Sequence, residues 1–131
     1  MAGHGDDFGD RDAVRWHVAA YWNIHRRHRT VMVALRQAAI VDESFARQAQ
    51  EMLEPDLHDL AGHLAGLDLP GDPLVIAMIF TELLQSFASA WLSGNRPDLG
   101  HPVSDEEAIK TLTSFVYAGI GGTPRAEQAR R

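Results

Sequence analysis

The sequence predicts an all-α protein built from five helices, and three observations support this prediction. A chain of 131 residues with 45% apolar residues can bury the core of a single domain. No two alternating apolar runs are joined by a hairpin dipeptide, and β-branched residues do not cluster between turns. Aspartate or serine instead precedes several segments in which apolar residues recur every three or four positions. We therefore expect one helical domain over 12–122, between a flexible lead (1–11) and a flexible tail (123–131).

The charge and the missing cysteines exclude several classes of function. The formal net charge is −6 at pH 7, and cysteine is absent. An acidic chain lacks the broad basic face that binds nucleic acid, and without cysteine it forms neither a disulfide nor a thiolate metal site. No uninterrupted apolar run is long enough to span a bilayer, and no signal peptide is visible at the start. These features predict a soluble cytoplasmic protein with no membrane partner.

The first two predicted helices meet at a basic stretch, HRRHR (25–29). Asp10 or Asp12 is suited to begin the first helix, which carries apolar and aromatic residues at helical spacing and ends within this stretch. The second helix is short and ends at about Ile40, and we expect Thr30 to cap its start.

The third predicted helix contains a proline. It begins at Asp42, a favourable capping residue, and its apolar stripe continues to about Leu67. Pro55 lies inside this segment. Proline removes one backbone donor and clashes with the preceding turn, so we expect either a kink near 51–55 or two separate helices.

The last two helices have clear starting signals. Asp72 caps the fourth helix, Pro73 takes its first position, and the helix runs to about Ser93. Ser104 and Glu107 have the spacing of a capping box at the start of the fifth helix. We expect Gly94-Asn95 to end the fourth helix and Gly121-Gly122 to end the fifth.

The fourth helix is apolar on nearly all sides. Glu82 is its only charged residue, and the fifth helix carries no charge between Thr111 and Gly122. A surface helix of a small monomer normally has a charged face, so these two helices predict a homodimer with an intersubunit four-helix bundle. The alternative is that the fourth helix is the core helix of a monomer. The residues expected at the dimer interface are Leu83, Phe87, Ala90, Trp91, Leu112, Phe115 and Val116.

The order and spacing of these helices resemble the C-terminal ligand-binding and dimerisation domain of TetR-family transcriptional regulators. Three segments carry the resemblance: YWNIHRRHRTVMVALRQAAIVDESFARQ, DPLVIAMIFTELLQSFASAWLSGNRPD and SDEEAIKTLTSFVYAGIGG. The resemblance as a whole covers about residues 12–122. The family carries a helix-turn-helix DNA-binding head before this domain, and no segment here matches it. The resemblance therefore implies DNA contact only through a missing N-terminal domain.

The resemblance also implies a cavity between the first four helices that binds a small, largely apolar effector. Such a cavity combines apolar walls with a few polar groups that orient the ligand. The alternative for its polar members is ordinary packing, with Thr81 bonding to its own helix and Gln85 to a neighbouring backbone. The candidate effector-binding residues are His17, Tyr21, Leu35, Phe45, Ala49, Met52, Leu53, Met78, Thr81 and Gln85.

The HRRHR stretch has three interpretations. His25 and His28 have the i, i+3 spacing of two metal ligands, but no cysteine, HExxH or paired ExxH motif supplies the rest, so we predict no metal and no cofactor. The stretch is too short for a nucleic acid interface. The third interpretation is that its cations stabilise the C-terminal end of the first helix, and also seat the DNA-binding head or an acidic partner.

Catalytic motifs are missing from the sequence. It contains no GxSxG, GxGxxG or phosphate loop, and no serine has a histidine and an aspartate at a recognisable spacing, so we predict no enzyme activity. Two alternatives to an effector-sensing domain stay open. One is a small helical protein or enzyme that binds metal through histidines and carboxylates, and the other is a dimerisation module without a pocket.

Overall fold

The computed structural model of the protein describes residues 8–94 and 96–121 and confirms the prediction of an all-α fold. Five helices and no strand are found within these two ranges. The helices are α1 (Arg11–Arg27), α2 (Arg29–Val41), α3 (Glu43–Leu64), α4 (Pro73–Leu92) and α5 (Asp105–Gly119).

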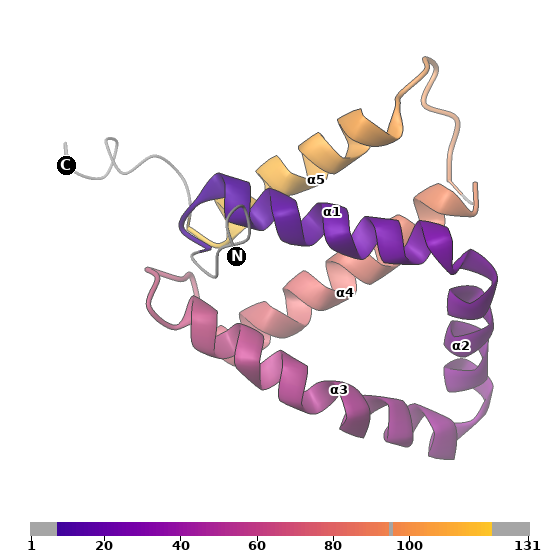
Figure 1. Cartoon of the computed structure of the whole chain (residues 1–131), viewed down its shortest axis with the longest axis horizontal. Coiled ribbons are helices and arrows are strands. Elements are labelled where there is room, and N and C mark those ends of the chain that lie inside the picture. Colours follow the sequence, from indigo (N-terminus) through magenta and orange to yellow (C-terminus); the bar gives the residue numbers. More distant parts are fainter. Residues whose placement is uncertain (1–7, 95, 122–131) are drawn as a thin grey trace.

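Helix α1 is the central element of the arrangement (Figure 1). It packs against both α4 and α5, while α4 returns along α3 after the loop over 65–72. The short helix α2 connects the end of α1 to the start of α3, and it contacts α4 as well as both of these neighbours. The first four helices therefore form a frame, and α5 lies on the side of α1 away from α3 (Figure 1).

The hydrophobic core lies mainly where α1 meets α4 and α5. Val14, Val18 and Trp22 of α1 are all buried there. Apolar side chains recur along one face of each of these helices, and burying that face stabilises the domain. In contrast, α2 has no buried residue, and Leu64 is the only buried residue of α3. The buried core residues of α4 and α5 are Ala77, Phe80, Leu84, Ala88, Ala108, Ile109, Leu112 and Val116.

Four of the predicted helix starts are confirmed. The side chains of Asp10, Asp42, Asp72 and Ser104 each accept a hydrogen bond from a backbone N–H in the first turn of their helix. The prediction that Thr30 caps α2 is wrong. Only His28 separates α1 from α2, so the second helix begins before Thr30 and has no side-chain cap.

The proline in α3 does not divide the helix. Helix α3 is a single element from Glu43 to Leu64, so the alternative of two helices is wrong. Both Pro55 and Glu51, one turn earlier, are exposed. Water can therefore hydrogen-bond to the backbone carbonyl that a proline leaves without its helical donor.

The N-terminal lead, which was expected to be flexible, contributes a residue to the core. Phe8 is 1% exposed and packs against the rings of His17 and Phe80, at centroid distances of 4.7 and 5.9 Å. The Tyr117 hydroxyl donates a hydrogen bond to the Gly9 carbonyl over 3.2 Å. The expected flexibility of residues 1–7 and of the tail 123–131 concerns segments outside the described residues.

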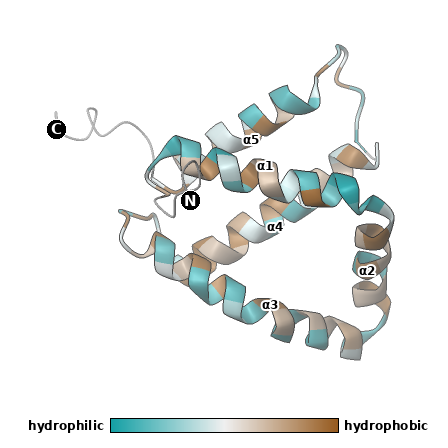
Figure 2. Cartoon of the chain, in the orientation of Figure 1, coloured by the Kyte–Doolittle hydropathy of each residue, from teal (hydrophilic) through white to brown (hydrophobic). Residues whose placement is uncertain are grey.

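The expectation that no apolar segment could span a bilayer is wrong on length and composition. Within the described residues, α4 alone meets both requirements, with 20 residues and a mean hydropathy of 1.5 over its most apolar window. A single Glu82 does not lower this average enough to exclude it. Pale and brown residues run along α4 in Figure 2. Core helices of water-soluble proteins pass the same test, and α4 contacts α1, α2 and α3.

Replacing Phe8 tests whether the lead belongs to the folded domain. We expect Phe8→Ala to lower the free energy of unfolding by about 3 kcal/mol, because it leaves a cavity against Phe80. Urea denaturation of both proteins measures the difference. Leu99→Ala, at a partly exposed loop position, serves as the control and should change the value by less than about 0.5 kcal/mol. An unchanged stability of Phe8→Ala would show that this contact does not form.

Candidate functional site

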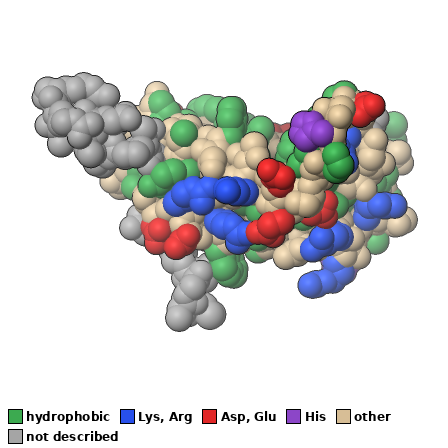
Figure 3. Space-filling view, turned by 90° about the horizontal axis from the view of Figure 1, so that it is seen from above, with side chains coloured by type: hydrophobic (Ala, Val, Ile, Leu, Met, Phe, Trp, Pro, Cys, Tyr) green, Lys and Arg blue, Asp and Glu red, His purple; other side chains and the backbone are tan. Residues whose placement is uncertain are grey.

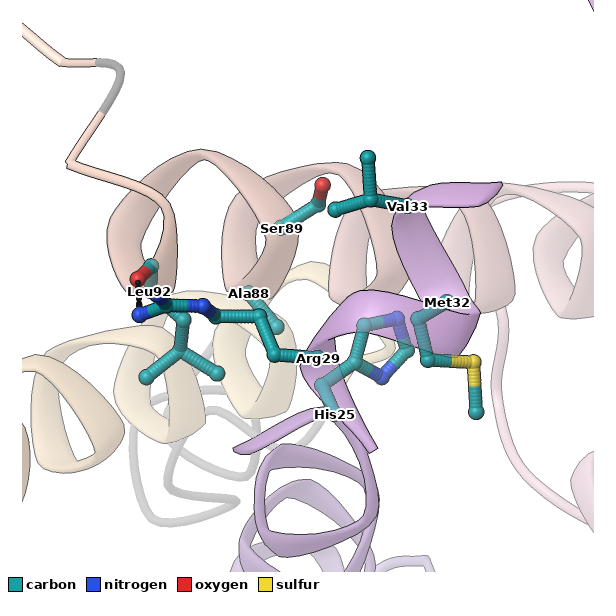
Figure 4. Close-up of a pocket in the computed structure, with 7 residues that line it drawn as sticks. All are labelled: His25, Arg29, Met32, Val33, Ala88, Ser89 and Leu92. Atoms are coloured by element: carbon teal, nitrogen blue, oxygen red, sulfur yellow. Dashed lines mark hydrogen bonds between the residues drawn. The ribbon is translucent and has the colours of Figure 1, made fainter. Parts of the chain in front are cut away.

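A shallow hollow lies where the end of α1 meets α2 and the C-terminal part of α4 (Figure 4). Its empty volume is about 190 Å³, part of which is open solvent. The space that it encloses holds only about one water molecule. Pockets that enclose a drug-sized ligand measure roughly 300–1,000 Å³, so the hollow is a surface depression and not a pocket for a whole ligand. Three elements supply its lining, which consists of His25, Arg29, Met32, Val33, Ala88, Ser89 and Leu92.

The HRRHR stretch connects three helices at this hollow. The Arg29 guanidinium donates a hydrogen bond of 2.9 Å to the Leu92 carbonyl in the last turn of α4. Arg26 forms an ion pair of 3.1 Å with Asp105 in the first turn of α5, and it also donates to Asn23. The stretch was predicted to stabilise the end of its own helix. The first three residues of the stretch do lie in the last turn of α1, and the charge of Arg29 in addition compensates the carbonyls at the end of α4.

His25 is the buried member of this stretch. Its side chain is stacked on Tyr21 at a centroid distance of 5.0 Å, and the residue is 5% exposed. Nδ1 lies 3.3 Å from the Tyr21 carbonyl, so this nitrogen carries the proton that is donated. Burial lowers the pKa of His25, the Tyr21 carbonyl acts in the opposite direction, and the charge of Arg36 lowers the pKa further.

Arg36 extends the positive region along α2. Its guanidinium donates a hydrogen bond of 3.3 Å to the Ser86 hydroxyl of α4. Among the described residues neither Arg36 nor Arg29 forms an ion pair with a carboxylate. Glu82 is the only acidic residue of α4. Burial raises the pKa of Tyr21, and the negative charge of Glu82 raises it further. Arg29 thus lines the hollow and Arg36 lies outside the lining, one turn of α2 beyond it, and within the described residues no carboxylate pairs with either guanidinium group.

The charged face over α1 and α5 is different, because two of the three arginines that join these helices are paired with carboxylates. Arg15 contacts Glu106, Arg26 pairs with Asp105, and Arg11 donates to Ser114. Blue and red side chains lie next to one another across this face in Figure 3. Exposed pairs of this kind contribute little to stability, about 0–1 kcal/mol each. They indicate a solvated surface rather than a binding site.

The structure brings none of the ten residues predicted to bind an effector to this hollow. Thr81 donates to the Ala77 carbonyl of its own helix over 2.9 Å, which is the ordinary packing alternative. His17 is covered by Phe8. Four members lie on three different helices and are between 46% and 79% exposed: Leu35, Met52, Leu53 and Met78. Their binding role stays a prediction.

The hollow itself was missed because its signals are weak in the sequence. Ala88 and Ser89 are small residues on a helix that is apolar throughout, and no periodicity distinguishes them. The only signal was the basic stretch, and its spacing could not show that Arg29 reaches across to α4. That contact joins residues that are far apart along the chain.

The residues predicted for a dimer interface occupy two different environments. Leu112 and Val116 pack inside the core of their own chain. Phe87 and Trp91 contact Trp22, with ring centroids 5.8 and 6.2 Å apart. Phe115, by contrast, is 68% exposed and points away from the core. Of the predicted set, Phe115 is thus the large apolar residue that a single chain leaves uncovered.

No group of three or more His, Asp or Glu residues within the described ranges is arranged to hold a metal ion. Glu54 and His58 are 4.0 Å apart on the exposed side of α3, without a third ligand. Comparison of the chain with models of protein families gives no match, and comparisons with curated proteins and with solved structures give none either.

The pH dependence of folding tests the environment of His25. A histidine whose pKa is lowered on folding resists protonation, whereas the unfolded chain takes up the proton near its ordinary value of 6.5. Its contribution to stability is therefore complete above about pH 6.5 and decreases as the pH falls below that value. We expect His25→Gln to lose less stability than the natural protein between about pH 7.5 and about pH 5.5, as measured by urea denaturation.

The matched control is His28→Gln, which alters an exposed histidine of the same stretch. This variant should keep the pH dependence of the natural protein. If His25→Gln and the natural protein changed equally over this range, His25 would not be buried in its neutral form.

Proposed function

We propose that this chain is the effector-sensing and dimerisation domain of a TetR-like transcriptional regulator. The observation that carries the proposal is that a single chain leaves many large apolar side chains exposed on α2, α3, α4 and α5. They are Val31, Leu35, Ile40, Val41, Met52, Leu53, Val75, Met78, Ile79 and Phe115. At roughly 25 cal/mol per Å² of apolar area, covering even part of this surface would stabilise the protein by several kcal/mol.

The N-terminal half of α3 supports an effector site. Leu53, Leu57 and Leu60 follow one another at helical spacing, so their side chains point to the same side of the helix. Leu57 and Leu60 pack against the core, whereas Leu53 is 56% exposed. The apolar stripe is thus covered at Leu57 and Leu60 and exposed at Leu53, near the middle of α3. A small apolar ligand between α2, α3 and α4 would cover Leu53.

The outer face of α5 supports association of two chains. Phe115 is exposed, and no charged residue follows Thr111 in this helix. A second copy that places α4 and α5 against the same helices of its partner would bury Phe115 and form a four-helix bundle. In a full-length regulator, an effector would favour one arrangement of the two chains over another and so alter the spacing of the DNA-binding heads.

A dimerisation module without an effector is the second candidate. Two observations favour it: Thr81 bonds to its own helix, and the hollow is small. Thermal unfolding in the presence of apolar small molecules separates the two functions. A ligand that binds only the folded protein raises the melting temperature. We expect some members of such a panel to do so, and a dimer that responds to none of them would favour the second candidate.

Phe115 is the residue with which to test the dimer. We expect Phe115→Asp to weaken association by roughly 3 kcal/mol or more, because it places an unpaired charge in an apolar interface. Light scattering should then give the mass of one chain for the variant and of two chains for the natural protein. Since Phe115 lies outside the core, the variant should still unfold cooperatively.

Leu99→Asp makes the same chemical change at another partly exposed position and should leave the dimer intact. A natural protein that has the mass of one chain, or a Phe115→Asp variant that stays dimeric, would contradict the placement of α5 at the interface.

A further inference from the structure

The hollow at the α1–α2 junction combines cations with an apolar lining. The protein as a whole is acidic, with a net charge of −6, yet the Arg36 and Arg29 guanidinium groups have no carboxylate partner among the described residues. Arg36 is only partly exposed, and its one hydrogen bond goes to a neutral hydroxyl over 3.3 Å. A partly buried cation is stabilised by an anion, and the chain does not supply one here.

The two arginines are not equivalent. Arg29 is held by the Leu92 carbonyl and neutralises the end of α4. Arg36 follows Met32 by one turn of α2 and reaches α4 at Ser86, one turn before the part of α4 that lines the hollow. Its planar guanidinium has further N–H donors, which suit the two oxygens of a carboxylate.

His25 lies on the inner side of the same hollow. Its Nδ1 is engaged with the Tyr21 carbonyl, and Nε2 has no hydrogen-bond partner in the described part of the chain. Met32, Val33, Ala88 and Leu92 provide the apolar part of the lining (Figure 4). Beyond the hollow, the exposed side chain of Leu35, three residues after Met32, continues the apolar surface of α2.

We propose that the head group of an alkyl carboxylate binds at the edge of this hollow, with Arg36, one turn along α2, pairing the carboxylate beside His25 and the alkyl chain lying along α2 toward the exposed Leu53 of α3. The inference rests on the proposed effector-sensing function and specifies the chemical class of the effector. The hollow encloses too little space for the whole molecule, so the alkyl chain would lie outside it on the open surface.

A singly charged head group fits better than a phosphate. Glu82 precedes Ser86 by one turn on α4, and its negative charge adds to burial in raising the pKa of Tyr21, which stacks on His25. A doubly charged anion would experience this repulsion more strongly. Of the two arginines, only Arg36 lacks a backbone carbonyl as its partner.

The experiment is isothermal titration of the full chain with decanoate, below the concentration at which it forms micelles. Decanol has the same chain with a neutral head, and acetate has the same head without the chain. We expect decanoate to bind saturably and at least about tenfold more tightly than either, because a charge-assisted pair contributes more than a neutral hydrogen bond. Arg36→Gln should weaken decanoate binding by about tenfold, and Arg27→Gln, at an exposed arginine of the HRRHR stretch, should leave it unchanged.

Circular dichroism of Arg36→Gln verifies that it keeps the natural fold. Equal binding of decanol and decanoate would overturn the carboxylate assignment, while the proposed apolar effector site would stand. Equal losses in Arg36→Gln and Arg27→Gln would also overturn it, because they would indicate general attraction to a basic stretch. Absence of any decanoate binding overturns the inference as well, and the response to the panel of neutral apolar molecules then decides the proposed function separately.

Discussion

The structure depends on one cluster of aromatic side chains around Trp22. This residue is buried in α1 and contacts Phe87 and Trp91 of α4, and the Trp91 indole in turn donates a hydrogen bond of 3.0 Å to Asp105 of α5. Asp105 also pairs with Arg26, one turn after Trp22. Three helices are thus fixed at one point. Within the described residues the Trp22 indole is the only buried side-chain nitrogen or oxygen without a hydrogen bond, a cost of about 1–3 kcal/mol that the large buried area of the ring offsets.

The helices outside this cluster are held by fewer contacts. Helix α2 has no buried residue, and two hydrogen bonds from Arg29 and Arg36 connect it to α4. Parts of a protein with few buried apolar contacts open at a lower free energy than the core. By this argument α2 opens at a lower free energy than the core of α1, α4 and α5. Such a division suits a domain in which a ligand stabilises one arrangement of the outer helices.

The sequence was sufficient to predict the helices but not their partners. Aspartate and serine caps at Asp10, Asp42, Asp72 and Ser104 depend on local chemistry, and all four form. Phe8 was missed because one aromatic residue in a glycine-rich lead has no periodicity. Periodicity also shows which face of a helix is apolar without showing what covers it. Leu112 and Phe115 belong to the same uncharged segment of α5, yet the first packs in the core and the second faces outward.

The arginines in and beside the basic stretch have different roles, because some hold the helices together and others do not. Arg26 and Arg29 are engaged with the start of α5 and the end of α4, so they hold the domain together and are not free for a ligand. His25 is buried beside the hollow, and Arg36 brings a second cation to the same place from the next helix. The fold needs neither of these two as a charge, because one is stabilised in its neutral form and the other bonds to a hydroxyl. The charge of Arg36 has no carboxylate partner within the described residues, and the apolar surface beside it is exposed. An amphiphilic anion would pair with this charge and cover this surface.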